Sequence, residues 1–255
     1  MIDIHTHLLF GIDDGCESLN DTLAMAEAAV KEGIHTIIAT PHHKNGRYEN
    51  SKDAILLKTG ELNEVLKENQ IPLTVLPGQE PRIHGEILED YRKGEILTLN
   101  NGGQYLFIEL PSSHVPRYTE KLLYEIQMEG LTPIIVHPER NQEIIQEPDI
   151  LYRLVNNGAL TQVTASSLTG HFGKKIKKFS CQLIEANLTH FISSDAHNLT
   201  HRPYRLSEAY DEVDQSYGID TVFLFTENAE LLVQGLNVYK EPPEKVKTKK
   251  FLGLF

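Results

Sequence analysis

Two pairs of possible metal ligands have a spacing that suits metal binding, one at the start of the chain and one on the last expected strand. The segment DIHTH at residues 3–7 places His5 and His7 two positions apart, so on a strand both imidazoles face the same side and could chelate one ion. Asp195 and His197 repeat this two-residue spacing at the last expected strand. One such pair is weak evidence, because a single histidine is more often a satisfied core or surface residue. Two pairs predict a shared metal centre if the fold brings them together.

Four further titratable side chains stand at or just after the ends of apolar segments. Glu80 follows LTVLPGQ and Glu109 closes YLFIE, where a buried carboxylate requires a compensating charge. His42 comes directly after a Thr-Pro pair, and His137 ends TPIIVH. Taken singly, each acid could belong to an ordinary salt bridge. A metal site with several imidazoles would explain all four positions. We interpret five of the 12 histidines as ligands: His5, His7, His42, His137 and His197.

This set of side chains is larger than one catalytic ion requires. Such an ion usually takes three protein ligands and keeps a position for water, so we expect two or three metal ions. Mixed nitrogen and oxygen ligands suit manganese, and iron or zinc would also fit, whereas the lack of thiolates disfavours a structural zinc site. Neighbouring ions would share a hydroxide and clamp the attacking and leaving oxygens of a displacement. Phosphoester hydrolysis is therefore the expected chemistry.

Two arginines stand close to candidate ligands in the sequence and could bind a phosphate. Arg140 follows His137 by three positions, and Arg202 follows His197 by five. A guanidinium group holds phosphate through two parallel hydrogen bonds, although either arginine could equally be a surface ion-pair partner. We predict that both act as the phosphate clamp.

The elements that must position these residues alternate along the chain. Helix-like periodicity is clearest at residues 19–32, 51–69, 119–129, 150–157, 174–187 and 202–217. Apolar runs typical of strands lie at residues 1–7, 35–40, 73–78, 105–109, 132–137, 160–164 and 190–194.

Strands that alternate with helices indicate a parallel sheet covered by helices, either an open doubly wound sheet or a closed barrel. The glycine-rich phosphate loop usual in open sheets is absent from the sequence, which favours the barrel. Candidate ligands follow six of the seven expected strands. In an α/β barrel the active site lies at the carboxyl ends of the strands, and the first and last strands are neighbours. The barrel would thus bring the His5/His7 pair and the Asp195/His197 pair together.

The length of 255 residues suits one barrel domain, which we place at residues 1–239. The segment KEPPEKVKTKK begins at residue 240, and we expect residues 240–255 to form a flexible basic tail outside the domain. A frayed terminus and a docking segment for a partner or a second subunit are both compatible with this composition. No stretch is apolar for long enough to span a membrane, and the first residues carry acids where a secretion signal carries bases, so we expect a cytoplasmic protein.

Composition also excludes some functions. With 24 basic and 36 acidic residues the formal net charge is −12, which disfavours broad binding to nucleic acid. Cysteine-dependent phosphatases need an arginine six positions after the nucleophile, and here Thr22 follows Cys16 and Asn187 follows Cys181 at that distance. That mechanism is excluded.

Six motifs occur in a characteristic order, and together they resemble the PHP (polymerase and histidinol phosphatase) phosphoesterases, in particular the bacterial CpsB/YwqE-type tyrosine-protein phosphatases. The motifs are MIDIHTHLLFGIDDG, TPHH, PGQE, FIEL, VHPER and SDAHN, and the resemblance extends to about Val238. It implies a distorted (β/α)7 barrel with a trinuclear, typically manganese-dependent centre at the carboxyl ends of the strands.

The resemblance also implies how the ligands are shared among three ions. Three groups would form, two of which share Glu80: His5, His7, Glu80 and Asp195; Glu80, Glu109 and His137; and His42, His197 and Asp14. Asp13 remains an alternative to Asp14. Arg140 would bind phosphate, Arg202 would assist, and His197 or a metal-bound water would be the general acid.

The implied role is dephosphorylation of a bacterial tyrosine kinase and its substrates, which regulates capsule or exopolysaccharide synthesis. A homo-oligomer is compatible with this role. The alternatives are a small-molecule phosphatase such as histidinol phosphatase, or a metal-binding regulatory module without turnover. Amidohydrolase barrels share the first histidine pair, but they commonly carry a modified lysine where this chain has Glu109.

Overall fold

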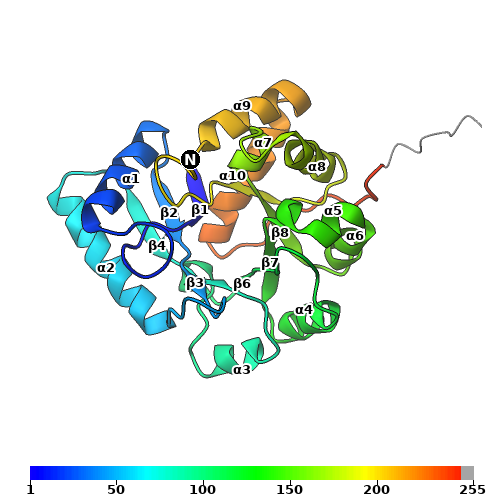
Figure 1. Ribbon diagram of the computed structural model, residues 1–255, viewed down its shortest axis with the longest axis horizontal. Helices are drawn as coiled ribbons and strands as arrows, with labels where there is room; N and C mark the ends of the chain where they lie inside the picture. Colours follow the sequence, from blue (N-terminus) through cyan, green and yellow to red (C-terminus); the bar gives the residue numbers. More distant parts are fainter. Residues whose placement is uncertain (248–255) are drawn as a thin grey trace, which may run out of the picture.

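Strands and helices alternate along the chain in this computed structural model, which describes residues 1–247 (Figure 1). Two very short strands, β3 (His42–His43) and β5 (Glu80–Pro81), follow the second and third of the expected strands. All described strand pairs are parallel. The seven expected strands are present as β1 (Ile2–Thr6), β2 (Thr36–Ala39), β4 (Thr74–Pro77), β6 (Tyr105–Ile108), β7 (Thr132–Val136), β8 (Leu160–Thr164) and β9 (Phe191–Ser193).

The described pairings form three sheets with the strand orders β1-β2-β4, β3-β5 and β6-β7-β8-β9. The first and last strands lie side by side, as the barrel prediction requires. The Asp195 N–H donates to the carbonyl oxygen of His5 at 2.9 Å, and the His7 N–H donates to that of Ala196 at 2.9 Å. The His5/His7 pair and the Asp195/His197 pair therefore meet.

The ring of strands is interrupted on the other side. The 3-10 helix η1 (Leu99–Asn101) lies between β4 and β6 and contacts both. β5 approaches β6 through one bridge, where the Glu109 N–H donates to the carbonyl oxygen of Pro81 at 3.0 Å. The fold is thus α/β with parallel sheets, and its hydrogen bonding departs from the unbroken ring of seven strands expected for a regular barrel.

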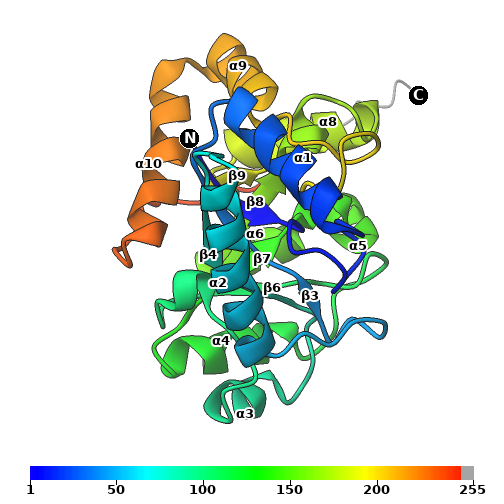
Figure 2. The same cartoon turned by 90° about the vertical axis from the view of Figure 1, so that its left-hand side faces the viewer.

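Helices cover the outside of the sheets (Figures 1 and 2). The six expected helices are α1 (Leu19–Lys31), α2 (Lys52–Glu68), α4 (Thr119–Met128), α6 (Asp149–Asn156), α8 (Lys174–Glu185) and α9 (Leu206–Tyr217). Four more were not expected from the sequence: α3 (Ile87–Arg92), α5 (Gln142–Gln146), α7 (Ala165–Leu168) and α10 (Ile219–Val233). The 3-10 helix η2 (Pro138–Arg140) follows β7.

The longest of the unexpected helices, α10, contacts β1, β9 and η1. Its Ala229 and Leu232 join a buried cluster with strand residues such as Ile4, Phe107 and Ile134. Its apolar side chains occur nearly all round the helix, which hides the single apolar stripe by which amphipathic helices are recognised in a sequence.

The first half of the expected basic tail contacts the domain. The Glu244 N–H donates to the carbonyl oxygen of Ala186 at 2.8 Å, and Lys245 pairs with Asp149 at 2.7 Å. Val246 is buried in the main apolar cluster. Residues 248–255, which complete the tail prediction, lie outside the described residues. Within residues 1–247, none of the helices has the length and apolar composition that crossing a membrane requires.

Candidate metal centre

The nine predicted ligands converge from the carboxyl ends of the strands. Each side chain lies within 4 Å of at least one other member of the set. Six of them stand on a strand or directly after one, two follow β9 within four residues, and the ninth belongs to the loop between β1 and α1. They are His5, His7, Asp14, His42, Glu80, Glu109, His137, Asp195 and His197.

The first group has the spacing of ligands around a single ion. His5 Nε2 lies 3.5 Å from Glu80 Oε2 and 3.4 Å from Asp195 Oδ1. His7 Nε2 lies 3.4 Å from Glu80 Oε2 and 3.3 Å from Asp195 Oδ1. Tetrahedral ligands about 2.1 Å from an ion are roughly 3.4 Å from one another. The four atoms therefore suit one ion between them.

A second group surrounds Glu80 on its other side. His42 Nδ1 lies 2.8 Å from Glu80 Oε2 and 3.7 Å from Glu109 Oε2. His137 Nε2 lies 2.8 Å from Glu80 Oε1. Glu80 thus faces imidazoles on both sides, as expected of a carboxylate that bridges two ions.

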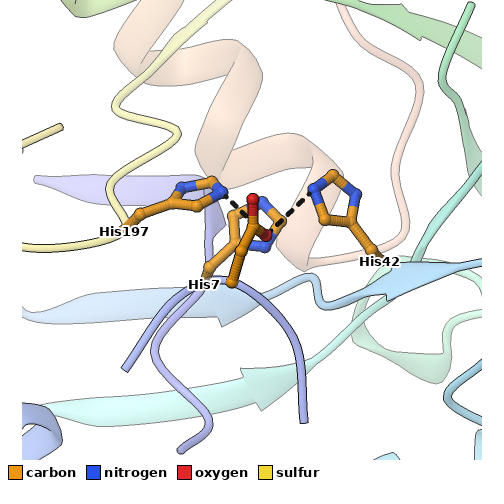
Figure 3. Close-up of side chains that lie close together, drawn as sticks. His7, His42 and His197 are labelled. Atoms are coloured by element: carbon orange, nitrogen blue, oxygen red, sulfur yellow. Dashed lines mark ion pairs between the residues drawn. The ribbon is translucent and has the colours of Figure 1, made fainter. Parts of the chain in front are cut away.

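The third group is built around Asp14. Its Oδ1 lies 3.3 Å from His42 Nε2 and 3.5 Å from His197 Nε2. Figure 3 shows the rings of His7, His42 and His197 turned toward one another in this region, and the ring centroids of His7 and His197 are 3.7 Å apart. His42 offers both of its nitrogens, one to this group and one to Glu80.

Unpaired buried atoms test whether the residues fit metal ions. A buried polar atom normally has a hydrogen-bond partner, and one without a partner requires an explanation. Seven atoms of the predicted ligands are fully buried and make no well-formed hydrogen bond among the described residues, although His42 Nδ1 and Glu80 Oε2 lie 2.8 Å apart: Nε2 of His5, His7 and His197, Nδ1 of His42, Oε2 of Glu80 and Glu109, and Oδ1 of Asp195. Their concentration at one place, each with a free lone pair or proton position, fits a set of metal ligands.

The carboxylates of this centre favour positive charge between them. Burial opposes ionisation of Glu80, but His42 and His5 hold its pKa well below the usual value. Burial likewise opposes charging of His42, yet Glu80 and Asp14 raise its pKa to about 10. Either a protonated imidazole or a metal cation can supply this charge, and a bound ion would displace the proton.

Two imidazoles remain neutral at physiological pH. Burial and the nearby Arg140 guanidinium lower the pKa of His137 to about 3. Burial and the charge of His7 lower the pKa of His197 to about 4. A neutral imidazole is the form that binds a metal, and it has no proton at Nε2 to give as a general acid if Nδ1 carries the hydrogen.

The backbone turns sharply where two of the ligands follow their strands. His137 has φ 36° and Asp195 has φ 52°, the left-handed region that residues other than glycine rarely adopt. Such conformations tend to occur at functional sites, where the surrounding structure holds them in place. Here they lie one and two residues after β7 and β9, and they direct both side chains into the shared centre.

Hydrogen bonds from outside the centre orient two of the histidines. Asp13 Oδ2 lies 2.6 Å from His7 Nδ1, and Gln162 Oε1 lies 2.9 Å from His5 Nδ1. Each contact leaves Nε2 as the metal-facing nitrogen. Asp13, the alternative to Asp14 as a ligand, thus contacts His7 at Nδ1, the nitrogen that faces away from the centre. Gln162 was not predicted from the sequence. A polar amide inside the otherwise apolar strand LTQVT could have identified it as a residue with a specific hydrogen-bond partner.

Both predicted arginines face Asp195 from the side opposite the histidines. Arg140 lies 2.7 Å from Asp195 Oδ2 and Arg202 lies 2.6 Å from it. Burial opposes ionisation of Asp195, but these guanidinium groups keep its pKa well below the usual value. A third arginine, Arg82, pairs with Glu109 at 2.9 Å and was not predicted.

A cavity of about 240 Å³ opens beside the second group. Its lining includes His42, Glu109, His137, Arg140 and Arg202. The cavity therefore places candidate metal ligands and both candidate phosphate-binding groups around the same space, which suits a phosphoester whose phosphoryl group enters between them.

Known proteins are similar to this chain in sequence and in fold. The family model described as capsular polysaccharide synthesis, CpsB/CapC, matches residues 1–234. The tyrosine-protein phosphatase YwqE of Bacillus subtilis is 48% identical over 255 residues, the whole of both chains. The tyrosine-protein phosphatase CpsB of Streptococcus agalactiae is 30% identical over 240 residues, which are 92% of this chain and 98% of the relative.

Solved structures of known proteins superpose on this chain. A structure described as YwqE from Bacillus subtilis and CpsB from Streptococcus pneumoniae, metal-dependent tyrosine phosphatases, superposes with a TM-score of 0.95 at 48% identity and covers 97% of this chain and 100% of the other. A phosphotriesterase homology protein from Escherichia coli superposes with a TM-score of 0.59 at 10% identity, covering 91% and 98% of the two chains, and shares the fold.

Proposed function

Because the chain belongs to the CpsB/CapC family of capsular polysaccharide synthesis, we propose that it is a metal-dependent tyrosine-protein phosphatase. One observation carries the proposal: three candidate ligands, His42, Glu109 and His137, line the same cavity as the two guanidinium groups. The names of YwqE and CpsB, and the description of their structures as metal-dependent, support it.

The proposed ions are two or three manganese ions held by the nine converging side chains. When bound, they would supply Lewis acidity toward the phosphoryl oxygens and lower the pKa of a water molecule. Asp13 and Gln162 keep the Nε2 atoms of His7 and His5 directed at the centre. Arg140 and Arg202 bind the remaining phosphoryl oxygens and neutralise the charge that grows on them during hydrolysis.

The leaving group fits a site with little general-acid assistance. The phenol of tyrosine has a pKa of about 10 and leaves more readily than an alkyl alcohol. His197, the candidate acid from the sequence, has a pKa lowered to about 4 and is neutral at pH 7. We therefore assign His197 to metal binding rather than to protonation of the departing phenol.

The proposed substrate is a phosphotyrosine protein, specifically a bacterial tyrosine kinase and its substrates, in a cytoplasmic pathway that regulates capsule or exopolysaccharide synthesis. The family description and the names of the relatives support this biology. We also propose that residues 1–239 form the phosphoesterase domain, as a distorted (β/α)7 barrel.

Phosphate release from two substrates tests the proposal. A phosphotyrosyl peptide and histidinol phosphate are compared on chelator-treated protein and on the same protein reloaded with manganese. We expect activity only after reloading and a higher kcat/KM for the peptide. A preference for histidinol phosphate would move the function to small-molecule metabolism with the same metal chemistry. Activity that ignores the chelator would contradict the metal mechanism, and metal binding without hydrolysis of either ester would indicate a regulatory module.

A further inference from the structure

Four of the chain's 24 lysine and arginine residues lie within five positions at the start of α8. Lys177 pairs with Glu212 on α9 at 2.7 Å. Lys174, Lys175 and Lys178 are exposed, and we call these three residues the α8 lysine cluster. A concentration of positive charge is unusual in a protein whose net charge is −12.

Local helix stability does not explain this cluster. The amino end of a helix carries partial positive charge, so acids stabilise the first turn and lysines oppose it. α1 follows that rule, with Asp21 in its first turn and Lys31 in its last. α8 has no acid in its first turn, and its N-cap residue Gly173 offers no side-chain cap. The lysines are placed where they cost helix stability, which indicates another role.

The start of α8 lies beside the segments that carry the two phosphate-binding arginines. Phe172, two residues before the helix, has its ring centroid 5.7 Å from the guanidinium carbon of Arg140. His171 Nε2 donates to the carbonyl oxygen of His201 at 2.9 Å, directly before Arg202. α8 also contacts η2, which ends in Arg140. The α8 lysine cluster thus follows within a few residues of a segment that contacts Arg140, which lines the phosphate cavity, and the residue before Arg202.

We propose that the α8 lysine cluster is a docking surface for acidic residues that flank the phosphotyrosine of a protein substrate. The inference rests on the proposed phosphatase function and extends it to substrate choice. An acidic segment is repelled by most of this acidic protein, and the cluster offers it local attraction next to the cavity. Charges at the edge of an interface act mainly on the association rate, and their effect weakens as salt rises.

Kinetics with a charge-neutralised variant test the docking surface. The variant K174Q/K175Q/K178Q is compared with wild type, both loaded with manganese. The substrates are a phosphotyrosyl peptide with glutamates on both sides, the same peptide with glutamines instead, and para-nitrophenyl phosphate. We expect KM for the acidic peptide to rise on the order of tenfold at low ionic strength, with kcat unchanged. KM for the other two substrates should stay constant, and the difference should shrink at high salt.

A matched variant controls for the loss of three positive charges. K67Q/K93Q/K121Q removes exposed lysines on or beside α2, α3 and α4, away from α8. It should leave KM for the acidic peptide within about twofold of wild type, since distant exposed charges are screened. The melting temperature of each variant shows whether the fold is retained.

Several outcomes would overturn the inference. They are an unchanged KM for the acidic peptide, an equal rise for the glutamine peptide, or an equal rise in the control variant. If wild type hydrolysed none of the substrates, the proposed function would fail separately. Fluorescence anisotropy with the acidic peptide would then still decide the docking question, because an equal Kd for wild type and the α8 variant excludes docking at the cluster.

Discussion

Asp13 holds His7 from behind: its Oδ2 atom lies 2.6 Å from Nδ1 of the imidazole, whose Nε2 atom faces the candidate metal centre. The same Oδ2 accepts a hydrogen bond from the backbone N–H of His42 at 3.2 Å, and Oδ1 accepts one from Gly15 at 2.9 Å. One carboxylate therefore connects two ligands and the turn that carries Asp14.

Replacement of this carboxylate should weaken metal binding without removing a ligand. In Asp13→Asn the amide retains the shape but loses the negative charge that orients His7. We expect manganese affinity to fall by about 10- to 100-fold, measured by titration of the metal-free protein. The exposed Asp211 on α9 supplies the control, and Asp211→Asn should bind manganese like wild type. Equal affinities for all three proteins would contradict a positioning role for Asp13.

The turn at Gly15 has no room for a side chain. A Cβ atom there would lie 2.1 Å from the carbonyl oxygen of His7 and 2.6 Å from its Cβ. Gly15→Ala should displace the loop, lower the free energy of unfolding and lose most bound manganese. Gly60→Ala is the matched control, because a Cβ on this helical residue meets no atom within 4 Å. It should raise stability by about 0.5–1 kcal/mol in urea denaturation. Normal manganese content in Gly15→Ala would refute the steric argument.

Metal removal should lower the melting temperature. The buried carboxylates of Glu80, Glu109 and Asp195 lose part of their compensating positive charge, and ions that bind only the folded state stabilise it. At a metal concentration of about 100 times Kd the gain is about 2.7 kcal/mol per ion, or roughly 5–10 °C for a chain of this size. Calorimetry before and after chelation measures this shift. No difference would mean that the centre does not bind manganese under those conditions.

Activity should require the guanidinium groups of the two arginines and not only their positive charge. Arg140 and Arg202 meet on Asp195 Oδ2, and lysine cannot reproduce the two-pronged contact with phosphate. Either Arg→Lys change should lower kcat/KM for para-nitrophenyl phosphate by about 10- to 100-fold, equal to roughly 1.4–2.7 kcal/mol. Arg153→Lys, on the exposed side of α6, should retain normal rates. Normal rates in both site variants would exclude the proposed phosphate clamp.

A histidine outside the site should make the fold sensitive to acid. Burial and the charge of Lys240 lower the pKa of His190 to about 3, and its Nδ1 accepts a hydrogen bond from the Thr161 N–H. In the unfolded chain His190 binds a proton near pH 6.5, whereas in the folded protein it does so only near pH 3. The free energy of unfolding therefore falls as the pH decreases from about 6.5 toward 3. At pH 5 the loss from this group is about 2 kcal/mol.

His190→Asn keeps an acceptor for Thr161 but cannot be protonated. Its unfolding free energy should therefore decline less than that of wild type between pH 7.5 and pH 5, by about 2 kcal/mol, in urea denaturation of metal-free protein. Parallel declines in the two proteins would show that His190 is protonated equally in the folded and unfolded chains.

Spacing along the chain was sufficient to predict much of this molecule. Residues two apart on a strand share a face. The segment DIHTH therefore predicted that the imidazoles of His5 and His7 converge, before the fold was known. Apolar runs alternating with amphipathic stretches predicted seven parallel strands, since both periodicities are set by local backbone geometry. α10 was not predicted because apolar residues occur nearly all round it. Without a single apolar stripe, the sequence shows no helical periodicity.

Only the tertiary structure decided how the members of the site meet. Asp13 and Asp14 are adjacent in sequence, and nothing local distinguishes their roles. The close approach of Gly15 to His7 turns one carboxylate behind His7 and the other toward His42 and His197. Gln162 reaches His5 across 157 positions of sequence, and such contacts depend on strand order rather than on neighbouring residues. The sequence by itself determined which residue types could form the centre, and long-range packing determined which atom each one presents.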